Sequence, residues 1–336
     1  MTALAPLQAE SPRGKGTPSI SPRPGGTQTA GNKARRRSKV KRGLEPWLYL
    51  APAFIVLIAL LGYPIFQLVN VSLYDYRQAQ VSGKAPLRFT GLENYQKLFA
   101  DPQFWTVLGN TVLFAAACVV LTLLVGSSLA VLATRLRPWV RSTLFVVSLG
   151  AWATPAVTGS AVWLFLFDPT LGLVNKTLVS VGLSEFAGHS WTYDKWSGFG
   201  LVASEVVWCS FPFVLVTVYA GIQAIPTEVI EAARIDGATM PRIAGSIMLP
   251  MLRPIVIVVT IQSIIWNFKI FSQIYIMTNG GGIAGQNLVL NVYGYQQAFA
   301  ASLYGLGSAL GVIMTALLMV ITLVYLRILK RTGEAL

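Results

Sequence analysis

Six long apolar stretches constrain the fold of this 336-residue chain more than any other feature. About 20 helical residues cross a hydrocarbon core of roughly 30 Å. Because backbone amides in lipid must be satisfied within their own segment, each stretch predicts a membrane-spanning helix. Only 12% of the residues are charged, against about 25% in soluble domains. We therefore predict an all-α polytopic membrane protein with six transmembrane helices, near residues 47–69, 107–133, 142–167, 199–223, 255–277 and 303–326.

Basic residues divide unequally between the two sides that these spans define. Nineteen Lys and Arg fall in the two tails and two loops of one side, and six fall on the other. By the positive-inside rule, both termini and the loop 224–254 are predicted to be cytoplasmic. The net charge of +13 then follows from topology, and we expect no nucleic-acid partner. Residues 1–45 are rich in Pro, Gly and Ser and predict a disordered basic tail, so the transmembrane domain is placed at 46–336.

The cytoplasmic loop 224–254 begins with a predicted short helix. Thr227 can cap this helix, and Glu228 and Glu231 place negative charge near its positive end. Gly237 is suited to end it in a left-handed conformation. Such a helix could enter a cleft on another protein, or it could be an ordinary turn in which Glu231 pairs with Arg234.

A second short helix is expected in the same loop. Thr239 and Pro241 can begin it. Pro250 and Pro254 are expected to end it before the fifth span, because proline in a helix interior removes a hydrogen bond.

Polar and aromatic residues gather on the fourth and fifth spans, which flank this loop. Aromatic faces and amide or hydroxyl groups together suit a sugar, although the same polar groups also join helices to one another. Charges inside a span need partners, so Glu205 and Lys269 form a possible ion pair. Alternatively, Lys269 reaches outward or meets an anionic or acetamido-bearing ligand.

The sequence offers no nucleotide, metal or catalytic site. Gly14-Lys15 is the nearest approach to a phosphate loop and lacks the first glycine of that motif. His189 stands alone in its loop, and no nucleophile has a base beside it. We expect no enzyme activity and no cofactor on this chain, with energy supplied by another polypeptide. A proton- or sodium-coupled carrier acting alone would need intramembrane carboxylates, and only Glu205 is available for that role.

The loop also carries a family pattern. Glu231-Ala232-Ala233, followed by Gly237 and then by Leu249-Pro250, resembles the EAA loop of permease subunits in binding-protein-dependent ABC importers. The triplet Asp236-Gly237-Ala238 is similar to the maltose-type carbohydrate branch. The strings FTGLENYQKLFADPQFW at 89–105 and TNGGG at 278–282 support the resemblance, which covers roughly residues 45–330.

The resemblance implies the permease fold and assigns roles within the loop. Glu231 would pair with an ATPase subunit, Ala232 and Ala233 would allow close approach, and Gly237 would form the bend. The coupling residues that it implies are Glu231, Ala232, Ala233, Asp236, Gly237, Ala238, Ile247, Leu249 and Pro250.

Two further strings resemble sugar-lining segments of the larger maltose-type permease. These are VWCSFPF at 207–213 and SIIWNFKIF at 263–271. The substrate-binding residues that they imply are Trp208, Ser210, Phe213, Ser263, Trp266, Asn267 and Ile270.

The resemblance also implies partners and a location. The chain would lie in a bacterial plasma membrane and pair with a second, related permease subunit as a heterodimer. Two ATP-binding subunits would hold ATP and Mg, and an extracytoplasmic solute-binding protein would dock on segments 70–105, 168–198 and 278–302. The implied function is ATP-driven import of a sugar, from mono- to oligosaccharide. The alternative is an importer of glycerol phosphate or a polyol.

Overall fold

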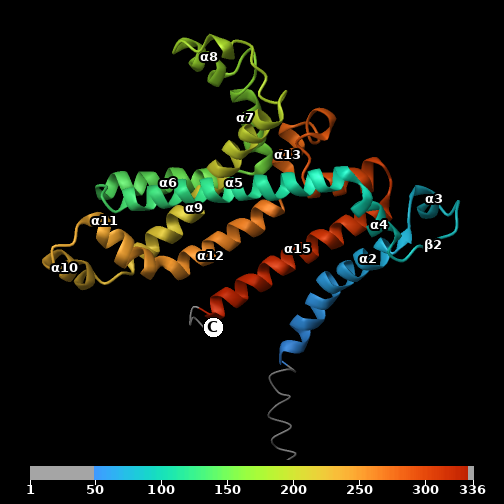
Figure 1. Ribbon diagram of the computed structural model, residues 1–336, viewed down its shortest axis with the longest axis horizontal. Helices are drawn as coiled ribbons and strands as arrows, with labels where there is room; N and C mark the ends of the chain where they lie inside the picture. The colour runs from blue at the N-terminus through green and yellow to red at the C-terminus, as the bar shows by residue number, and fades with distance from the viewer. Residues whose placement is uncertain (1–48, 332–336) are drawn as a thin grey trace, which may run out of the picture. The chain divides into compact units, whose positions relative to one another are not determined.

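The computed structural model describes residues 49–331, and the predicted tail at 1–45 lies outside them. The chain divides into two compact units, Met1–Tyr63 and Pro64–Leu336. In the first unit, the described residues belong to a helix that contains a π turn, η1 (Ile58–Gly62). The second unit is almost wholly helical (Figure 1). The predicted all-α class is confirmed.

Five helices in the described chain have the length and apolar character to cross a membrane. Four of them match predicted spans within a few residues. The fifth predicted span is present but shifted. These five helices are Tyr49–Ser72, which includes α2 (Tyr63–Ser72), α5 (Pro102–Ala133), α9 (Lys195–Gln223), Ala244–Phe268 and Tyr304–Ile328 of α15 (Tyr304–Arg331).

The predicted continuous span at 142–167 is wrong. This stretch forms α6 (Pro138–Ala153) and α7 (Ala156–Leu166), which are bent by 102° relative to each other. The cause is local: proline disfavours helical geometry in the residue before it, and Thr154 accordingly has an extended backbone with ψ 123° ahead of Pro155. The pair counts as a sixth span only if both halves are taken together.

The fifth span begins earlier and ends earlier than predicted. Helical structure continues through α11 (Met240–Ile243), the π turn η3 (Ala244–Met248) and α12 (Leu249–Phe268). The expectation that Pro250 and Pro254 end a short helix is therefore wrong. Pro250 lies directly after the π turn η3, in the first turn of α12. Pro254 is accommodated inside the helix.

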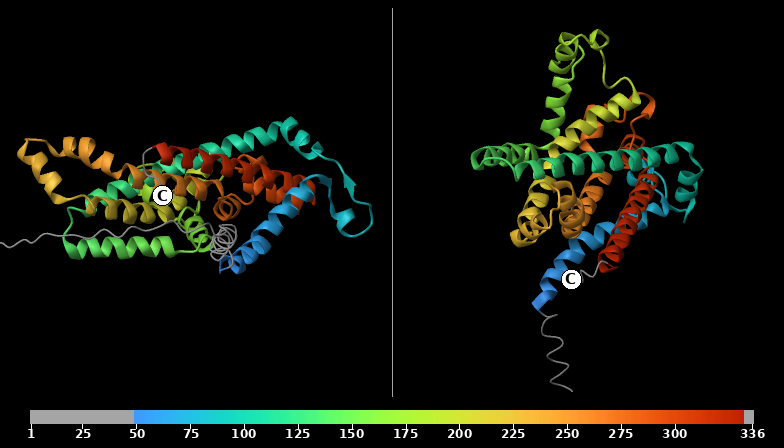
Figure 2. Two further views of the ribbon diagram at one scale, coloured as in Figure 1. Left: turned by 90° about the horizontal axis from the view of Figure 1, so that it is seen from below. Right: turned by 60° about the vertical axis from the view of Figure 1, so that its left-hand side comes forward.

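Helix α9 is the centre of the second unit. It packs along α5 and also contacts α6, α7 and α12, an arrangement visible in Figures 1 and 2. Gly126 of α5 allows the closest approach, since a Cβ added there would lie 2.5 Å from Val214 Cβ and 2.9 Å from the carbonyl oxygen of Phe211. The α5–α9 pair is thus the tight framework on which the other spans are arranged.

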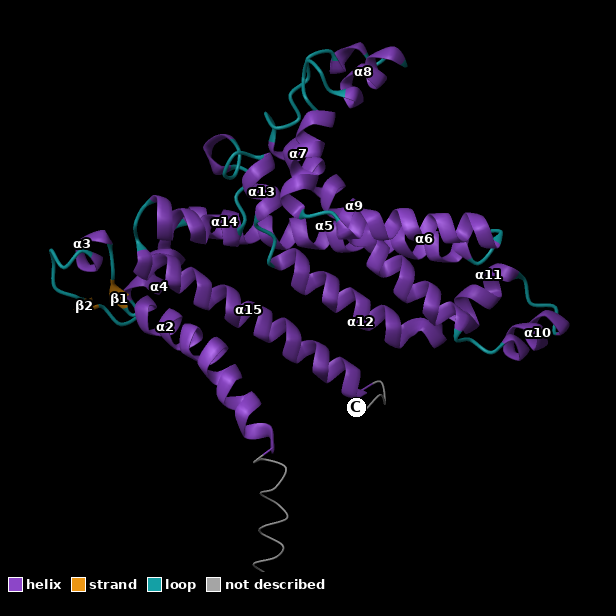
Figure 3. Cartoon of the chain, turned by 180° about the vertical axis from the view of Figure 1, so that it is seen from behind, coloured by secondary structure: helices purple, strands orange, loops and turns teal. Residues whose placement is uncertain are grey.

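Short elements occupy the connections, as Figure 3 shows. Strand β1 (Tyr74–Asp75) pairs antiparallel with β2 (Arg88–Phe89). The remaining short helices are α3 (Gln78–Val81), α4 (Glu93–Ala100), α8 (Leu173–Ser180), η2 (Ser184–Phe186), α10 (Thr227–Ile235), α13 (Ser272–Met277), η4 (Ile283–Gly285), α14 (Leu290–Tyr295) and η5 (Gln296–Ala300).

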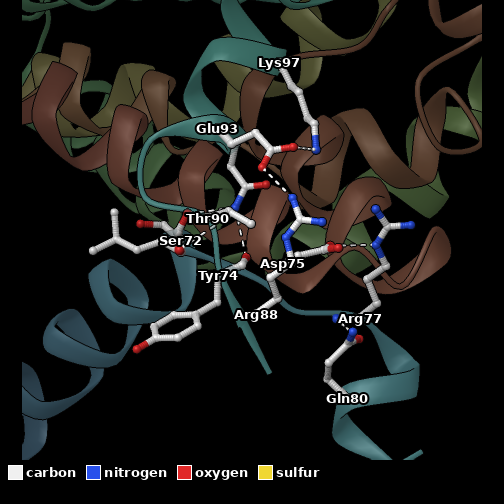
Figure 4. Close-up of polar contacts among 11 residues, drawn as sticks. Ser72, Tyr74, Asp75, Arg77, Gln80, Arg88, Thr90, Glu93 and Lys97 are labelled. Carbon is white, nitrogen blue, oxygen red and sulfur yellow. Dashed lines mark hydrogen bonds and ion pairs between the residues drawn. The ribbon is translucent and has the colours of Figure 1, made fainter. Parts of the chain in front are cut away.

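The hairpin region is held by charged contacts (Figure 4). Glu93 lies between Arg88 and Lys97, at 3.2 Å and 2.8 Å. Its hydrogen bond to Lys97 and the charge of that lysine lower the pKa of the carboxyl, and Arg88 adds to the effect. Arg77 pairs with Asp75 at 2.7 Å. These exposed pairs fix the local shape of the segment 70–105 more than they stabilise the fold.

Candidate functional site

The helix predicted in the cytoplasmic loop is α10. Its N-terminal cap is Pro226, so the expectation that Thr227 caps it is wrong: Thr227 is already the first helical residue. At the other end, Gly237 has φ +77°, and the N–H groups of Gly237 and Ala238 donate to the carbonyls of Arg234 and Ala233. This paired pattern is a Schellman motif. Gly237 therefore ends α10 in the left-handed conformation, as predicted.

One face of α10 is packed and the other is free in this chain. Ala233 is buried, and Ile230 packs on a cluster of buried residues that we name the α10 cluster. Its members are Ala130, Val214, Leu215, Val218, Ile222, Ile225, Leu252 and Val259, drawn from α5, α9 and α12 and the residues after α9. Ile230 thus joins α10 to this cluster, and Ala233 is a second buried position of the helix.

Several of the predicted coupling residues are exposed on α10 or directly after it. Glu231, Ala232, Asp236 and Gly237 are exposed, and Ala238 is half-buried. Beyond the bend, Ile247 is half-buried, while Leu249 and Pro250 are exposed. Prediction from the family pattern missed Ile235, whose side chain is 86% exposed. Ile235 lies one helical turn after Glu231, on the same side of α10.

Aromatic residues of the predicted sugar site form two ring contacts. Phe213 of α9 meets Trp266 of α12 edge to face, with 5.1 Å between ring centroids. Trp208 lies 4.8 Å from Trp163 of α7. The indole N–H of Trp163 donates to Ser204 Oγ at 2.7 Å. Trp163 was not predicted, and only the bend that starts α7 at Ala156 brings it to α9.

The remaining residues of the predicted site lie deeper. Ser263, Asn267 and Ile270 are buried, whereas Ser210 is half-buried. The amide of Asn267 donates to the carbonyl oxygen of Ser263 at 2.8 Å, one turn earlier. Its side-chain oxygen, Oδ1, is buried without a hydrogen-bond partner. An acceptor left unpaired in this way is available to a hydroxyl donor, because burial without a partner is costly.

The possible ion pair between Glu205 and Lys269 is not formed among the described residues. Glu205 is fully buried and accepts a hydrogen bond from Ser160 Oγ at 3.0 Å. Gly159 leaves room for it, since a Cβ there would lie 2.6 Å from Glu205 Oε1. Lys269 is exposed at the end of α12. The carboxyl thus joins α9 to α7 and not to α12.

The segment between α13 and α14 is pinned to two spans by side-chain amides. Asn110 of α5 donates to the carbonyls of Gln286 and Leu288, both at 3.1 Å. Asn287 donates to the carbonyl of Lys195, at the start of α9, at 2.8 Å. The segment 278–302 is therefore held in a defined shape next to α5 and α9. No cluster of three or more His, Cys, Asp or Glu residues suited to a metal occurs among residues 49–331.

The chain belongs to a known family. Residues 123–333 match the family described as binding-protein-dependent transport system inner membrane component. This match confirms the predicted permease family, and with it the role of a transport subunit in a membrane.

Two named relatives and one solved structure are similar to this chain over most of its length. The chain is 36% identical over 309 residues to the diacetylchitobiose uptake system permease protein DasB of Streptomyces coelicolor, covering 92% of this chain and 93% of that protein. It is 31% identical over 299 residues to the trehalose/maltose transport system permease protein MalF of Thermococcus litoralis, covering 88% and 97%. A chain of a solved bacterial ABC transporter for import of alginate superposes with TM-score 0.73 at 19% identity, covering 88% and 99%. That last likeness supports the fold alone.

Proposed function

We propose that this chain is a transmembrane subunit of an ATP-driven importer that moves a sugar into the cytoplasm. The observation that carries the proposal is the composition of α9 and α12, in which the rings of Phe213 and Trp266 meet and the residue after Trp266, Asn267, has a buried, unpaired acceptor. Aromatic faces stack on sugar C–H surfaces, and amides bind sugar hydroxyls. The names of the relatives, which refer to uptake of diacetylchitobiose and of trehalose or maltose, support the same substrate class.

The energy is supplied through α10. In this proposal, separate ATPase subunits hold ATP and Mg, and Glu231 pairs with one of them from the exposed face of α10. Closure of those subunits shifts the equilibrium between outward- and inward-facing states. Both termini and α10 lie in the cytoplasm, since basic residues concentrate on that side.

Two more partners complete the proposed assembly. A second, related permease forms the other half of the sugar path as a heterodimer. An extracytoplasmic solute-binding protein docks on the side that carries the charged hairpin and the segment pinned by Asn110 and Asn287.

The test is uptake in a strain whose own copy of this gene is deleted and replaced by variants. Labelled diacetylchitobiose, maltose, trehalose and glycerol phosphate are supplied in turn. Uptake of a saccharide that depends on the gene supports the proposal. Uptake of glycerol phosphate alone would favour the alternative, in which Lys269 meets an anionic ligand.

Glu231→Lys tests the coupling role. We expect normal abundance in the membrane but loss of uptake, because reversing the charge removes the proposed pairing with the ATPase. Glu228→Lys makes the same charge change three residues earlier on α10 and serves as the matched control. Unaltered uptake by Glu231→Lys would defeat the docking role.

A further inference from the structure

A row of aromatic rings leads from the hairpin region to the end of α12. Tyr76 lies 5.9 Å from Tyr304, and Tyr304 lies 6.4 Å from Phe299. Phe299 lies 5.1 Å from Tyr295, which lies 5.2 Å from Phe271. Tyr275 adds a sixth ring, stacked on Phe271 at 5.2 Å and 15°. We name these six residues the aromatic row.

The row borders a groove between α14, η5 and α15, with a volume of about 500 Å³. This volume is in the range that holds small ligands, roughly 300–1,000 Å³. Phe271, Tyr295, Phe299 and Tyr304 line it, together with the polar side chain of Asn291. Gly307 of α15 allows η5 to approach closely along the groove, since a Cβ there would lie 2.5 Å from Ala298 Cβ.

The rings of the row are not consumed by packing. Tyr275 and Tyr295 remain 37% and 39% exposed, and Phe299 remains 64% exposed. Buried core aromatics of this chain, such as Phe104 at 1%, differ sharply from them. Polar groups accompany the exposed rings: Tyr304 donates its hydroxyl to Gln78 Oε1 at 2.8 Å. Hydroxyl and amide groups beside such rings can bind the hydroxyls of a saccharide whose C–H face lies on a ring.

The inner end of the groove meets the proposed sugar site. Asn291 donates to the carbonyl oxygens of Phe268 and Ile270 at 3.5 Å and 3.4 Å. Phe271 directly follows Ile270, one of the site residues. The long distances to Asn291 describe weak hydrogen bonds, which a ligand hydroxyl can replace.

We propose that the aromatic row is a saccharide-binding path along which the sugar passes from the extracytoplasmic side to the α9–α12 site. This inference rests on the proposed function. Because the centroids of neighbouring rings are 5.1–6.4 Å apart, a saccharide can contact the next ring before it leaves the last one. On a path of this kind each ring binds the sugar, but none binds it tightly enough to hold it.

The experiment replaces Phe299, the most exposed ring of the row, in the same deletion strain. Phe299→Leu keeps the apolar volume but removes the ring, and Phe299→Tyr keeps the ring. Phe165→Leu is the matched control, since Phe165 is 65% exposed on α7 and outside the row. Uptake of labelled diacetylchitobiose is measured over a range of concentrations, with the amount of chain in the membrane and the copurifying subunits measured in parallel.

We expect Phe299→Leu to lower the maximal rate about fivefold, the effect of losing one stacking contact. The half-saturating concentration changes little, because the binding protein captures the sugar first. Phe299→Tyr restores the rate, and Phe165→Leu leaves it unchanged. A photoreactive diazirine derivative of diacetylchitobiose should also label peptides from 290–311, and unlabelled sugar should compete for this labelling.

Three results would overturn the inference. Wild-type rates in Phe299→Leu, or no competed labelling in 290–311, would remove the row from the sugar path and leave the proposed function standing. Loss of a copurifying permease from Phe299→Leu would make the groove a subunit contact. Equal uptake by the wild-type and deletion strains for every saccharide would refute the proposed function itself, and the row would fall with it.

Discussion

Replacing Gly126 by alanine should strain the close contact between α5 and α9. The added methyl group would lie 2.5 Å from Val214 Cβ and 2.9 Å from a backbone oxygen of Phe211. Neither atom is the far end of a flexible side chain, so α5 and α9 must move apart. Overpacking of this kind costs about 1–3 kcal/mol. The higher helix propensity of alanine over glycine offsets about 1 kcal/mol of it.

Gly109→Ala separates these two effects. Gly109 lies in the same helix, and a Cβ there meets nothing within 4 Å. Its variant therefore gains the propensity without the clash. The difference between the two variants isolates the packing cost, about 1–3 kcal/mol, which predicts a melting temperature for Gly126→Ala at least about 2 °C below that of Gly109→Ala.

Thermal exposure of a buried thiol measures this difference. The chain has two cysteines, and Cys118 is fully buried in α5 itself. In a Cys209→Ser background, a thiol-reactive dye reports only the unfolding that exposes Cys118. Equal melting temperatures for the Gly126→Ala and Gly109→Ala variants would refute the claim that α5 and α9 are in rigid contact at Gly126.

Three further predictions concern the loop, the outer segment and the site. Gly237→Ala meets no steric clash, but the alanine must adopt φ +77°, a conformation that costs about 1–2 kcal/mol. Amide hydrogen exchange in 227–237 should therefore become faster, and unchanged exchange would contradict this. Burial and then Asp101, which accepts the Tyr293 hydroxyl, raise the pKa of Tyr293 to about 12. The contribution of the Tyr293 hydroxyl to the free energy of unfolding is therefore complete below about pH 10 and is lost as the pH rises to about 12. The melting temperature of Tyr293→Phe should accordingly fall less than that of the wild type between these pH values. Trp163→Phe keeps an aromatic ring but removes the indole N–H that donates to Ser204, a hydrogen bond worth about 1 kcal/mol. Sugar uptake should fall while the amount of the chain in the membrane stays constant.

Long apolar stretches predicted most of the spans because a helix that crosses the membrane must be both long and apolar. They failed to predict the place where the backbone geometry breaks a helix. Hydropathy does not distinguish Pro155, which breaks a helix between α6 and α7, from Pro254, which α12 accommodates. The outcome depends on packing around each proline, which the sequence does not state.

The functional residues were predicted unevenly for a similar reason. Gly237 ends α10 as predicted, because only a local backbone rule is involved. Trp163 lies 45 residues before Trp208, and only the bend at Pro155 brings the two together. Glu205 was expected to pair with a cation, but Ser160 of α7 donates to one carboxyl oxygen, and the other, Oε1, is buried against Gly159 without a hydrogen-bond partner among the described residues. Partners far apart in sequence leave no local signal.

The close contact at Gly221 has a mechanical consequence for the site. A Cβ there would lie 2.5 Å from Ile255 Cδ1 and 2.9 Å from Leu252 Cδ2, so α9 and α12 pack closely near α10, with the ends of two α12 side chains against the α9 backbone. A load on α10 would turn both helices as one lever. With a rise of about 1.5 Å per residue, a tilt of roughly 10° moves Phe213, about 15 Å from the end of α9, by roughly 3 Å. Phe213 and Trp266 would move together, because both belong to this pair of helices. The ring contact between Trp208 of α9 and Trp163 of α7 would have to shift instead.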